Sequence, residues 1–281
     1  MQDFYTVAMA GLYSRAYHSE NYSTPVFDDY AARILITPEE CDQIPKYLLS
    51  GYSYVKQNVE DKNEALKSII NRFLSPSPLA VSAFTEAALR EAVDLGAQQY
   101  IIFGAGYDTF SIRQPEWALS LEILEFNDPN LTWDKRRRLN RANIELPPNV
   151  HYVGTTDSAE LARILGNGMI FDKEKVTFCS IPYMMNAYSK EDYDRLFLNL
   201  APFLSIGSTV ALEYPNGAVP AGYKYSELEE LMSRNGLQID RVLGPSEMTY
   251  EYFFDYNEAN PDYPITAPGN LSYCLAKKIY R

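Results

Sequence analysis

The sequence predicts an α/β protein with a doubly wound, mostly parallel sheet of seven strands and an N-terminal helical cap. Three observations carry this prediction. From Gln99 onward, short apolar stretches alternate with amphipathic ones, a pattern typical of βαβ units. Before Gln99, apolar residues recur at three and four positions, which indicates helices. A glycine-rich turn follows the first apolar stretch, where such sheets place the loop nearest to a ligand.

The N-terminal part, residues 1–97, is predicted to form a helical cap and lid. Helical spacing is clear in NEALKSIINRFL (63–74) and LAVSAFTEAALREAVDLG (79–96), and SPSP (75–78) is expected to separate the two helices. The chain has 281 residues, 46% of them hydrophobic, which is ample for one core, although two domains are also compatible with this length. We expect one domain, in which residues 98–281 form the α/β core.

Seven strands are predicted in that core. Five alternate with helices and should run parallel, and two more close the sheet. They are YIIFG (100–104), LEILEFN (121–127), VHYVG (150–154), KVTFCSIP (175–182), STVALEYP (208–215), LQIDRVLGP (237–245) and LSYCLAKKIY (271–280).

Charge, cysteine content and hydropathy exclude several classes of protein. A net charge of −12 opposes binding to nucleic acid, and the basic run 135–138 is expected to be a solvated helix face rather than an anion site. Cys41, Cys179 and Cys274 are far apart, so we expect reduced, mostly buried thiols and no bound metal. No apolar run approaches the ~20 residues of a membrane span and no leader is evident, so a cytoplasmic protein without a membrane partner is expected.

The loop GAGYDT (104–109) carries the first indication of a ligand. Thr109 stands where the dinucleotide fingerprint has its third glycine, which weakens a pyrophosphate interpretation. About 20 residues on, Glu125 ends the second strand, where a carboxylate can accept hydrogen bonds from both hydroxyls of a ribose. The combination indicates an adenosine ligand without pyrophosphate, and S-adenosylmethionine fits that description. A glycine turn and an acidic strand end without any ligand is the alternative.

Several motifs, in order, resemble the leucine carboxyl methyltransferase family and its bacterial branch of small-molecule O-methyltransferases of secondary metabolism. GAGYDT (104–109) and EFNDP (125–129) are similar to the family's first two sheet motifs. Upstream, VAMAGLYSRAYHSENYSTPVFDDYAARIL (7–35) resembles its helical cap. Downstream, VGTTD (153–157) and YMMNAYSKEDYDRLF (183–197) resemble its third-strand aspartate and the segment after its fourth strand.

The resemblance implies a class I methyltransferase-like fold, S-adenosylmethionine as cofactor and a small-molecule acceptor. Gly104 and Gly106 would contact the methionine part, Glu125 or Asn127 the ribose, and residues 156–157 would lie near the adenine. For Asp157, a helix N-cap is the alternative. The predicted cofactor-binding residues are Gly104, Ala105, Gly106, Asp108, Glu125, Phe126, Asn127, Thr156 and Asp157.

The chain also departs from the family pattern at three positions. In the region of residues 80–83, the family has an arginine that pairs with the cofactor carboxylate. This chain has Ala80, Val81 and Ala83 there, which supply no charge. Asn127 replaces an aspartate, and Pro182 falls near an expected glutamate. Other groups could hold the methionine moiety, or binding could be weaker, or the site could serve another reaction.

Methyl transfer from a sulfonium needs alignment and removal of water more than acid–base chemistry. A carboxylate acceptor needs no general base, whereas a phenol or alcohol does. Tyr13, Tyr17 and His18 of the cap are the catalytic candidates. For His18, an exposed helix position is the alternative, and His151 is expected to be structural.

The acceptor pocket is predicted to use tyrosines, of which the chain has 23. A tyrosine joins an apolar ring to a polar tip, which suits an amphipathic small molecule. Tyr183, Tyr188 and Tyr214 follow the fourth and fifth strands and are the candidates.

The sequence thus favours an S-adenosylmethionine-dependent O-methyltransferase that acts on a small molecule, with a carboxylate slightly preferred. A repurposed member of the fold, which binds a ligand without transferring methyl, is one alternative. A nicotinamide-dependent oxidoreductase is another, against which Thr109 counts.

Overall fold

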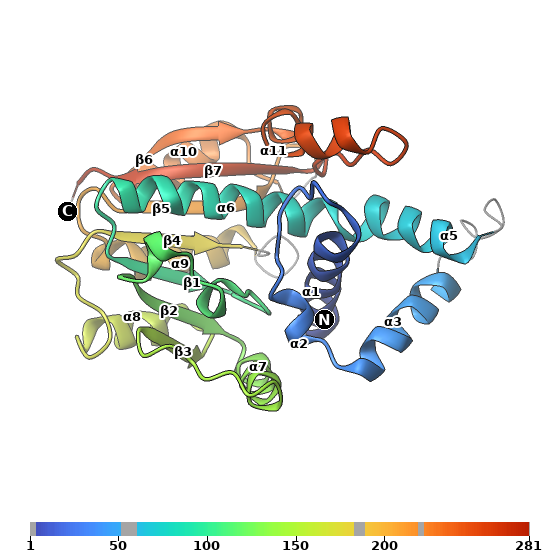
Figure 1. Ribbon diagram of the computed structural model, residues 1–281. Coiled ribbons are helices and arrows are strands. Elements are labelled where there is room, and N and C mark those ends of the chain that lie inside the picture. The colour runs from blue at the N-terminus through green and yellow to red at the C-terminus, as the bar shows by residue number, and fades with distance from the viewer. Residues whose placement is uncertain (1–3, 52–60, 183–188, 219–221, 281) are drawn as a thin grey trace.

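A seven-stranded sheet forms the centre of the molecule, in the order β3-β2-β1-β4-β5-β7-β6 (Figure 1). The computed structural model describes residues 4–51, 61–182, 189–218 and 222–280. β1 to β5 pair in parallel, and β7 runs antiparallel to both β5 and β6. The strands are β1 (Gln99–Phe103), β2 (Glu122–Asn127), β3 (Val150–Gly154), β4 (Thr177–Ile181), β5 (Thr209–Pro215), β6 (Leu237–Leu243) and β7 (Leu271–Lys278).

The predicted fold class is confirmed. Each predicted strand matches an observed one, with ends that differ by no more than two residues. Every residue of β1, β4 and β5 is buried. Helices must therefore cover both faces of these strands, which explains why their sequences are mostly apolar on both faces rather than alternating with exposed polar residues.

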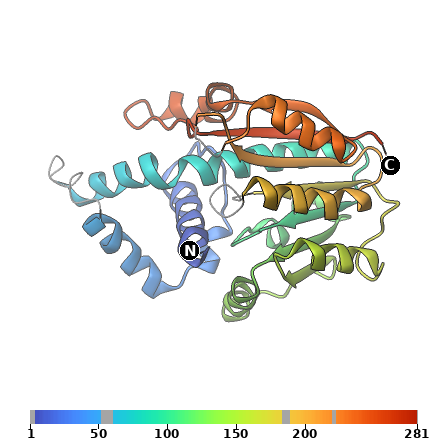
Figure 2. The same cartoon turned by 180° about the vertical axis from the view of Figure 1, so that it is seen from behind.

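Helices cover the sheet on both sides. α6 (Pro76–Asp94) lies along the face seen in Figure 1, and the view from behind shows α8, α9 and α10 on the other face (Figure 2). Neighbouring residues of β1 enter different cores: Ile102 belongs to the cluster that includes α6, and Ile101 to the cluster on the other face. The remaining helices of this part are α7 (Pro129–Arg141), α8 (Ser158–Gly166), α9 (Lys190–Leu200), α10 (Tyr225–Arg234) and α11 (Pro245–Ala259), with 3₁₀ turns η2 (Phe110–Ile112), η3 (Glu116–Ala118) and η5 (Ala201–Phe203).

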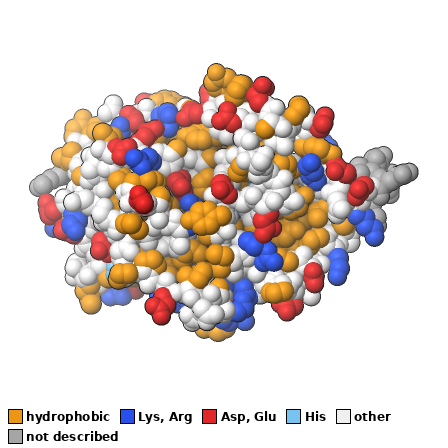
Figure 3. All heavy atoms as spheres, viewed as in Figure 1, with side chains coloured by type: hydrophobic (Ala, Val, Ile, Leu, Met, Phe, Trp, Pro, Cys, Tyr) orange, Lys and Arg blue, Asp and Glu red, His pale blue; other side chains and the backbone are white. Residues whose placement is uncertain are grey.

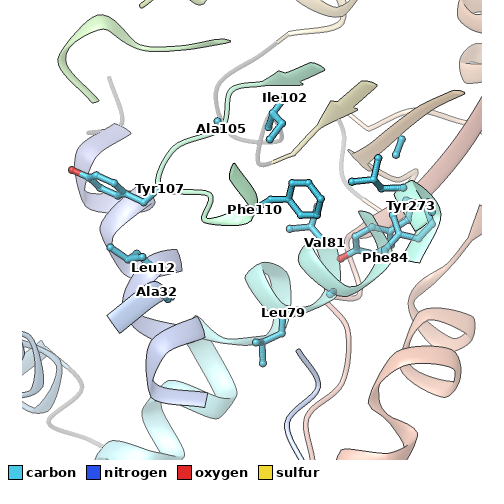
Figure 4. Packing of buried hydrophobic residues seen from close by; sticks show 14 of the residues in the cluster. Leu12, Ala32, Leu79, Val81, Phe84, Ile102, Ala105, Tyr107, Phe110 and Tyr273 are labelled. Atoms are coloured by element: carbon cyan, nitrogen blue, oxygen red, sulfur yellow. The ribbon is translucent and has the colours of Figure 1, made fainter. Parts of the chain in front are cut away.

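Aromatic side chains fill the core beneath α6. Figure 4 shows Val81 and Phe84 of α6 beside Phe110 and Tyr273, and the rings of Phe84 and Tyr273 lie 5.5 Å apart. This packing fixes α6 against the strands, so the side chains on its face are held at set positions along the sheet.

The cap lies at the end of the sheet toward which the carboxyl ends of β1 and β4 point (Figure 1). α1 contacts both α2 and α6, and α2 contacts α7. Its helices are α1 (Phe4–Asn21), α2 (Ala32–Leu35), α3 (Pro38–Gly51) and α5 (Lys62–Ile69). α6, which the predicted division at residue 97 assigns to the cap, lies along the sheet instead; the division itself stays a prediction.

The expected separation of the two helical segments at SPSP (75–78) is confirmed. α5 passes into a π-helical turn, η1 (Ile70–Leu74), Ser75 lies outside both segments, and α6 begins at Pro76. The amide of Ser75 donates to the carbonyl of Ile70 at 2.9 Å, a π-type bond. Proline is tolerated in the first turn of a helix, because the amide it lacks would have no partner there.

On the face shown in Figure 3, basic side chains lie among acidic ones, and apolar side chains gather over the middle. All three cysteines are free; Cys179 and Cys274 are buried and Cys41 is half-buried. Within the described ranges, no helix has both the length and the apolar composition that crossing a membrane requires.

Candidate functional site

The glycine loop follows β1 and adopts a conformation that only glycine takes readily. Gly104 has a φ of 81° and Gly106 a φ of 56°, both left-handed. The amides of Gly104 and Ala105 donate to the carbonyl oxygen of Phe126 at 2.8 and 3.2 Å, which ties the loop to the end of β2. The sheet order reverses between β1 and β4, so this loop lies at the switch point where doubly wound sheets bind ligands.

Asn127 clamps the glycine loop from the side. Its Oδ1 accepts from the Gly106 amide at 3.2 Å, and its Nδ2 donates to the Gly106 carbonyl at 2.8 Å. Oδ1 also accepts from the amide of Asp128 at 3.0 Å. An aspartate could not donate to the Gly106 carbonyl, so the amide at position 127 has a local structural reason.

A small pocket opens beside this loop, between α6 and the carboxyl ends of β1 and β4. The end of β4 contributes Ser180 and Pro182, and the glycine loop contributes Asp108. Figure 4 shows two of its walls, Val81 and Phe110, side by side. The pocket is lined by Phe27, Val81, Ser82, Thr85, Glu86, Leu89, Tyr100, Asp108, Phe110, Arg113, Ser180 and Pro182.

Arg113 is the one cation among the described residues of this pocket, and neighbouring groups already hold it. Its Nη1 and Nη2 donate to the two carboxylate oxygens of Glu86 at 3.1 and 2.6 Å. Its Nε donates to the Thr109 hydroxyl at 3.1 Å. With Asp108 and Glu86 both on its wall, the pocket is suited to a positively charged ligand group.

A buried carboxylate latches the cap onto the glycine loop. Asp29, 1% exposed, accepts from Arg15 Nε at 2.8 Å and from the Thr109 hydroxyl at 2.5 Å. Arg15 also donates to the carbonyl of Tyr107 at 2.8 Å. Sequence reasoning missed Arg15 and Arg113; the two aspartates that follow Phe27 were the only signal that pointed to Asp29.

Glu125 lies inside the protein rather than on the wall of the pocket. It is 2% exposed, and the ammonium of Lys135 lies 2.5 Å from its Oε2. Burial alone would lower the pKa of Lys135, but the Glu125 carboxylate outweighs that effect and raises it. Glu125 Oε1 has no hydrogen-bond partner within the described chain. The proposed contact between Glu125 and a ribose is therefore untested and stays a prediction.

The basic run 135–138 is not simply a solvated face, and that expectation is wrong for two of its members. Lys135 and Arg138 are each 1% exposed. Arg138 pairs with Asp134 at 2.5 Å and with Glu40 at 2.7 Å, which joins α7 to α3. The acidic partner of Arg138 in the cap comes from about a hundred residues upstream, so the run itself does not reveal it.

Two other predicted cofactor contacts have local structural roles. Asp157 is exposed and caps α8, accepting from the Ala159 amide at 2.9 Å, as its N-cap alternative predicted. Phe126 buries its ring in the core on the α9 side and presents only its backbone to the glycine loop. The adenine contacts of Thr156 and Asp157 stay predictions.

The three catalytic candidates of the cap lie on α1. His18 is fully buried between the rings of Tyr22 and Tyr256, so the exposed alternative is wrong. Burial lowers the pKa of His18 to about 3, and its Nε2 accepts from the Val26 amide at 3.1 Å, which does not favour a role as a general base.

Tyr13 is buried and Tyr17 half-buried, with ring centroids 6.4 Å apart. Burial raises the pKa of Tyr13 to about 12, so its hydroxyl stays protonated at neutral pH. Tyr214 is buried near the end of β5, and Tyr183 and Tyr188 lie outside the described residues. The acceptor roles of these tyrosines stay predictions. His151 lies half-buried on β3 with Nε2 3.2 Å from a Glu122 oxygen, a structural position.

Comparison with known proteins gives a family match, a sequence relative and a solved structure of similar fold. The family model described as leucine carboxyl methyltransferase matches residues 8–200. The chain is 29% identical over 285 residues to "Putative S-adenosyl-L-methionine-dependent methyltransferase YktD" of Bacillus subtilis strain 168, across 90% of this chain and 92% of that protein. Among solved structures, a duf574 family protein from Streptomyces avermitilis MA-4680 superposes with a TM-score of 0.51 and 16% identity, over 72% of this chain and 83% of that one.

Proposed function

Because the chain belongs to the leucine carboxyl methyltransferase family and is an S-adenosylmethionine-dependent methyltransferase, we propose that it methylates an oxygen atom of a small organic molecule, with a carboxylate preferred. The observation that carries the proposal is the pocket at the switch point between β1 and β4, which joins a preformed glycine loop to two carboxylates. Small-molecule sites in doubly wound folds lie at this place.

The described residues fit one end of the cofactor. S-adenosylmethionine, when bound, supplies a methyl group on a positively charged sulfonium, and its methionine end also carries an ammonium and a carboxylate. Gly104 and Gly106 would let the backbone approach that end, and Glu86 and Asp108 would face its positive groups. Among the described residues of the pocket, Arg113 is the one cation that its carboxylate would meet, and Glu86 already engages Arg113. The pocket therefore suits the cationic groups better than the carboxylate.

The preference for a carboxylate acceptor rests on the state of the bases in the described pocket. Its two carboxylates are already engaged, Glu86 by Arg113 and Asp108 by the Phe110 amide. None of the described residues that line the pocket is a histidine or a lysine. His18 is buried with a pKa of about 3, and Tyr13, with a pKa of about 12, can donate a hydrogen bond but not accept a proton at neutral pH. A carboxylate is already anionic at neutral pH and needs no such group.

We propose Tyr13 and Tyr17 as contacts of the acceptor from the cap side. The latch between Asp29 and Thr109 holds α1 and the loop after it against the glycine loop, which excludes water from that side. The secondary-metabolism context also remains a proposal that the family match permits.

Titration and a transfer assay test the function together. Calorimetry should show binding of S-adenosylmethionine and S-adenosylhomocysteine and none of NAD. Radiolabelled methyl transfer should then favour benzoate over phenol and benzyl alcohol, three probes of similar size. Preference for phenol would overturn the carboxylate assignment. Tight cofactor binding with no transfer to any of a broad panel of acids, phenols and alcohols would favour the repurposed-fold alternative, and NAD binding would favour an oxidoreductase.

A further inference from the structure

A second hollow, here the η1 groove, lies between the π-helical turn η1 and the chain that joins α11 to β7. We propose that the η1 groove binds the methyl acceptor and that an anionic group on the acceptor pairs with Arg72. The identity of the occupant rests on the proposed methyltransferase function. The groove is lined by Ser68, Asn71, Arg72, Phe73, Pro76, Ser77 and residues 262–271.

Arg72 offers an exposed positive charge in this groove. Its guanidinium lies 5.5 Å from the centre of the Phe73 ring. Among the described residues, no carboxylate lies within 4.0 Å of it, whereas Arg15 has one and Arg113 and Arg138 have two each. In a chain with a net charge of −12, an unpaired guanidinium beside an aromatic ring is suited to an organic anion.

Asn71 provides a second, independent sign of a ligand. Its side chain is 5% exposed, and its Nδ2 donates to the hydroxyls of Tyr22 at 2.8 Å and Tyr256 at 3.1 Å. These two bonds fix the amide, yet its Oδ1 has no hydrogen-bond partner in the described part of the chain. A buried carbonyl without a partner costs free energy, and a ligand donor in the groove would recover it if the groove wall shifts to expose this oxygen on binding.

The backbone of η1 is itself unusual at this place. The π-type bond from Ser75 to Ile70 inserts one extra residue into the turn, and π turns within α-helices occur frequently at functional sites. The turn holds Asn71 buried against the cap while its neighbours Arg72 and Phe73 remain exposed.

The opposite wall is built in advance, although residues 262–271 contain little regular structure. The amide of Asn257 exchanges two hydrogen bonds with the backbone of Ile265, at 2.8 and 3.0 Å. The hydroxyl of Thr249 accepts from the Ala267 amide at 2.9 Å. A wall that is pinned to α11 in this way would not have to become ordered when a ligand binds, which favours affinity.

The position of the groove along α6 identifies its occupant. Ser77 lines the η1 groove, and Val81 and Thr85 line the pocket at the switch point. These residues are four apart, so they share one face of α6, and the rise of an α-helix separates the first two by about 6 Å. A molecule in the groove would therefore lie next to a cofactor in the pocket. An acceptor of this kind carries two groups: a separate anionic group at Arg72, which benzoate probes, and the oxygen to be methylated, which lies toward Ser77.

Asp262 also lines the groove, so the sign of the ligand charge can be tested in both directions. The probes are benzoate, neutral benzamide and cationic benzylamine, measured by ligand-observed NMR titration. We expect benzoate to bind best, Arg72→Gln to weaken it at least fivefold, and Asp262→Asn to strengthen it. Arg141→Gln, an exposed arginine on α7, is the matched control and should change nothing.

Equal benzoate affinity in Arg72→Gln and Arg141→Gln would overturn the proposal, as would a preference for benzylamine that Asp262→Asn abolishes. Calorimetry of S-adenosylhomocysteine on the same variants distinguishes failure of the groove proposal from failure of the proposed function. Its binding should stay within twofold in Arg72→Gln, because Arg72 does not line the cofactor pocket. If the wild type bound no S-adenosylhomocysteine, the proposed function would fail, while the benzoate result would still decide the groove.

Discussion

Two acid–base pairs lie near the carboxyl ends of the strands, and they differ in how far water reaches them. Glu125 and Lys135 are sealed, with side chains 2% and 1% exposed. Glu86 and Arg113 form a pair of similar length on the wall of the switch-point pocket, where the Glu86 side chain is 26% exposed. The first pair is closed off from water in this structure, whereas the second lies on the wall of the switch-point pocket.

The comparison shows that an acidic residue near a strand end is not by itself a ligand site. What decides its role is the helix that follows. α7 brings Lys135 back onto Glu125 ten residues later, and Tyr152 and Ser111, hydrogen-bonded at 2.9 Å, close the space beside them. The pocket has no such closure because α6 presents only small or uncharged side chains there apart from Glu86.

The largest effect is expected from a substitution that breaks the buried ion pair between Glu125 and Lys135. Glu125→Gln leaves the Lys135 ammonium buried without a counter-charge, and should lower the free energy of unfolding by on the order of 3 kcal/mol in urea denaturation. Replacing both residues, as Glu125→Gln with Lys135→Met, should recover part of that loss. If Glu125→Gln were as stable as wild type but bound S-adenosylhomocysteine much more weakly, Glu125 would be a ribose ligand and the contrast between the two pairs would disappear.

His18 is another titratable group that water does not reach. Its burial predicts a pH dependence of the free energy of unfolding. Burial lowers its pKa from 6.5 to about 3, so between those values the unfolded chain binds a proton that the folded chain does not. Its contribution to stability is complete above pH 6.5 and falls by about 1.4 kcal/mol per pH unit on acidification, down to about pH 3.

The check is the pH dependence of the free energy of unfolding from urea titrations. His18→Gln retains an acceptor for the Val26 amide but does not titrate, so its slope should be shallower than that of wild type by one proton. His151→Gln controls for the loss of a histidine as such. Identical slopes in wild type and His18→Gln would show that His18 is not sealed.

The smallest effect is expected at the ion pair between Glu86 and Arg113 on the wall of the switch-point pocket. Glu86→Gln would free Arg113 to meet a ligand carboxylate, because both of its terminal nitrogens now donate to Glu86. The affinity ratio of S-adenosylhomocysteine to its decarboxylated analogue should rise about fivefold in calorimetric titrations. Glu91→Gln makes the same charge change on an exposed part of α6 and should leave the ratio unchanged. An unchanged ratio in Glu86→Gln would show that Arg113 does not face the carboxylate.

The sheet could be predicted from sequence because its signal is local. A strand such as β5 contains a short apolar stretch that is buried (210–212), and the segments beside β5 carry glycine or proline. The glycine loop was predictable for the same reason, since left-handed φ values require glycine at two nearby positions.

The surroundings of the pocket were not predictable in this way. Thr109 bonds to Asp29 across 80 residues, and Arg138 reaches Glu40 across 98. The clamp of Asn127 on Gly106 spans 21. No periodicity links such positions, so whether a charged side chain is exposed or sealed depends on packing that forms only in the folded chain.

The π turn η1 also changes the rotation of α5 about the helix axis relative to α6. One residue more than an α-helical turn rotates everything before it by about 100° relative to everything after it. α5 thereby directs Glu64 and Lys67 at Tyr263, while α6 keeps its small residues toward the pocket. Deletion of Leu74, which does not line the groove, would restore regular phase, turn Glu64 and Lys67 away from Tyr263, and remove one anchor of the groove wall while every lining residue is retained.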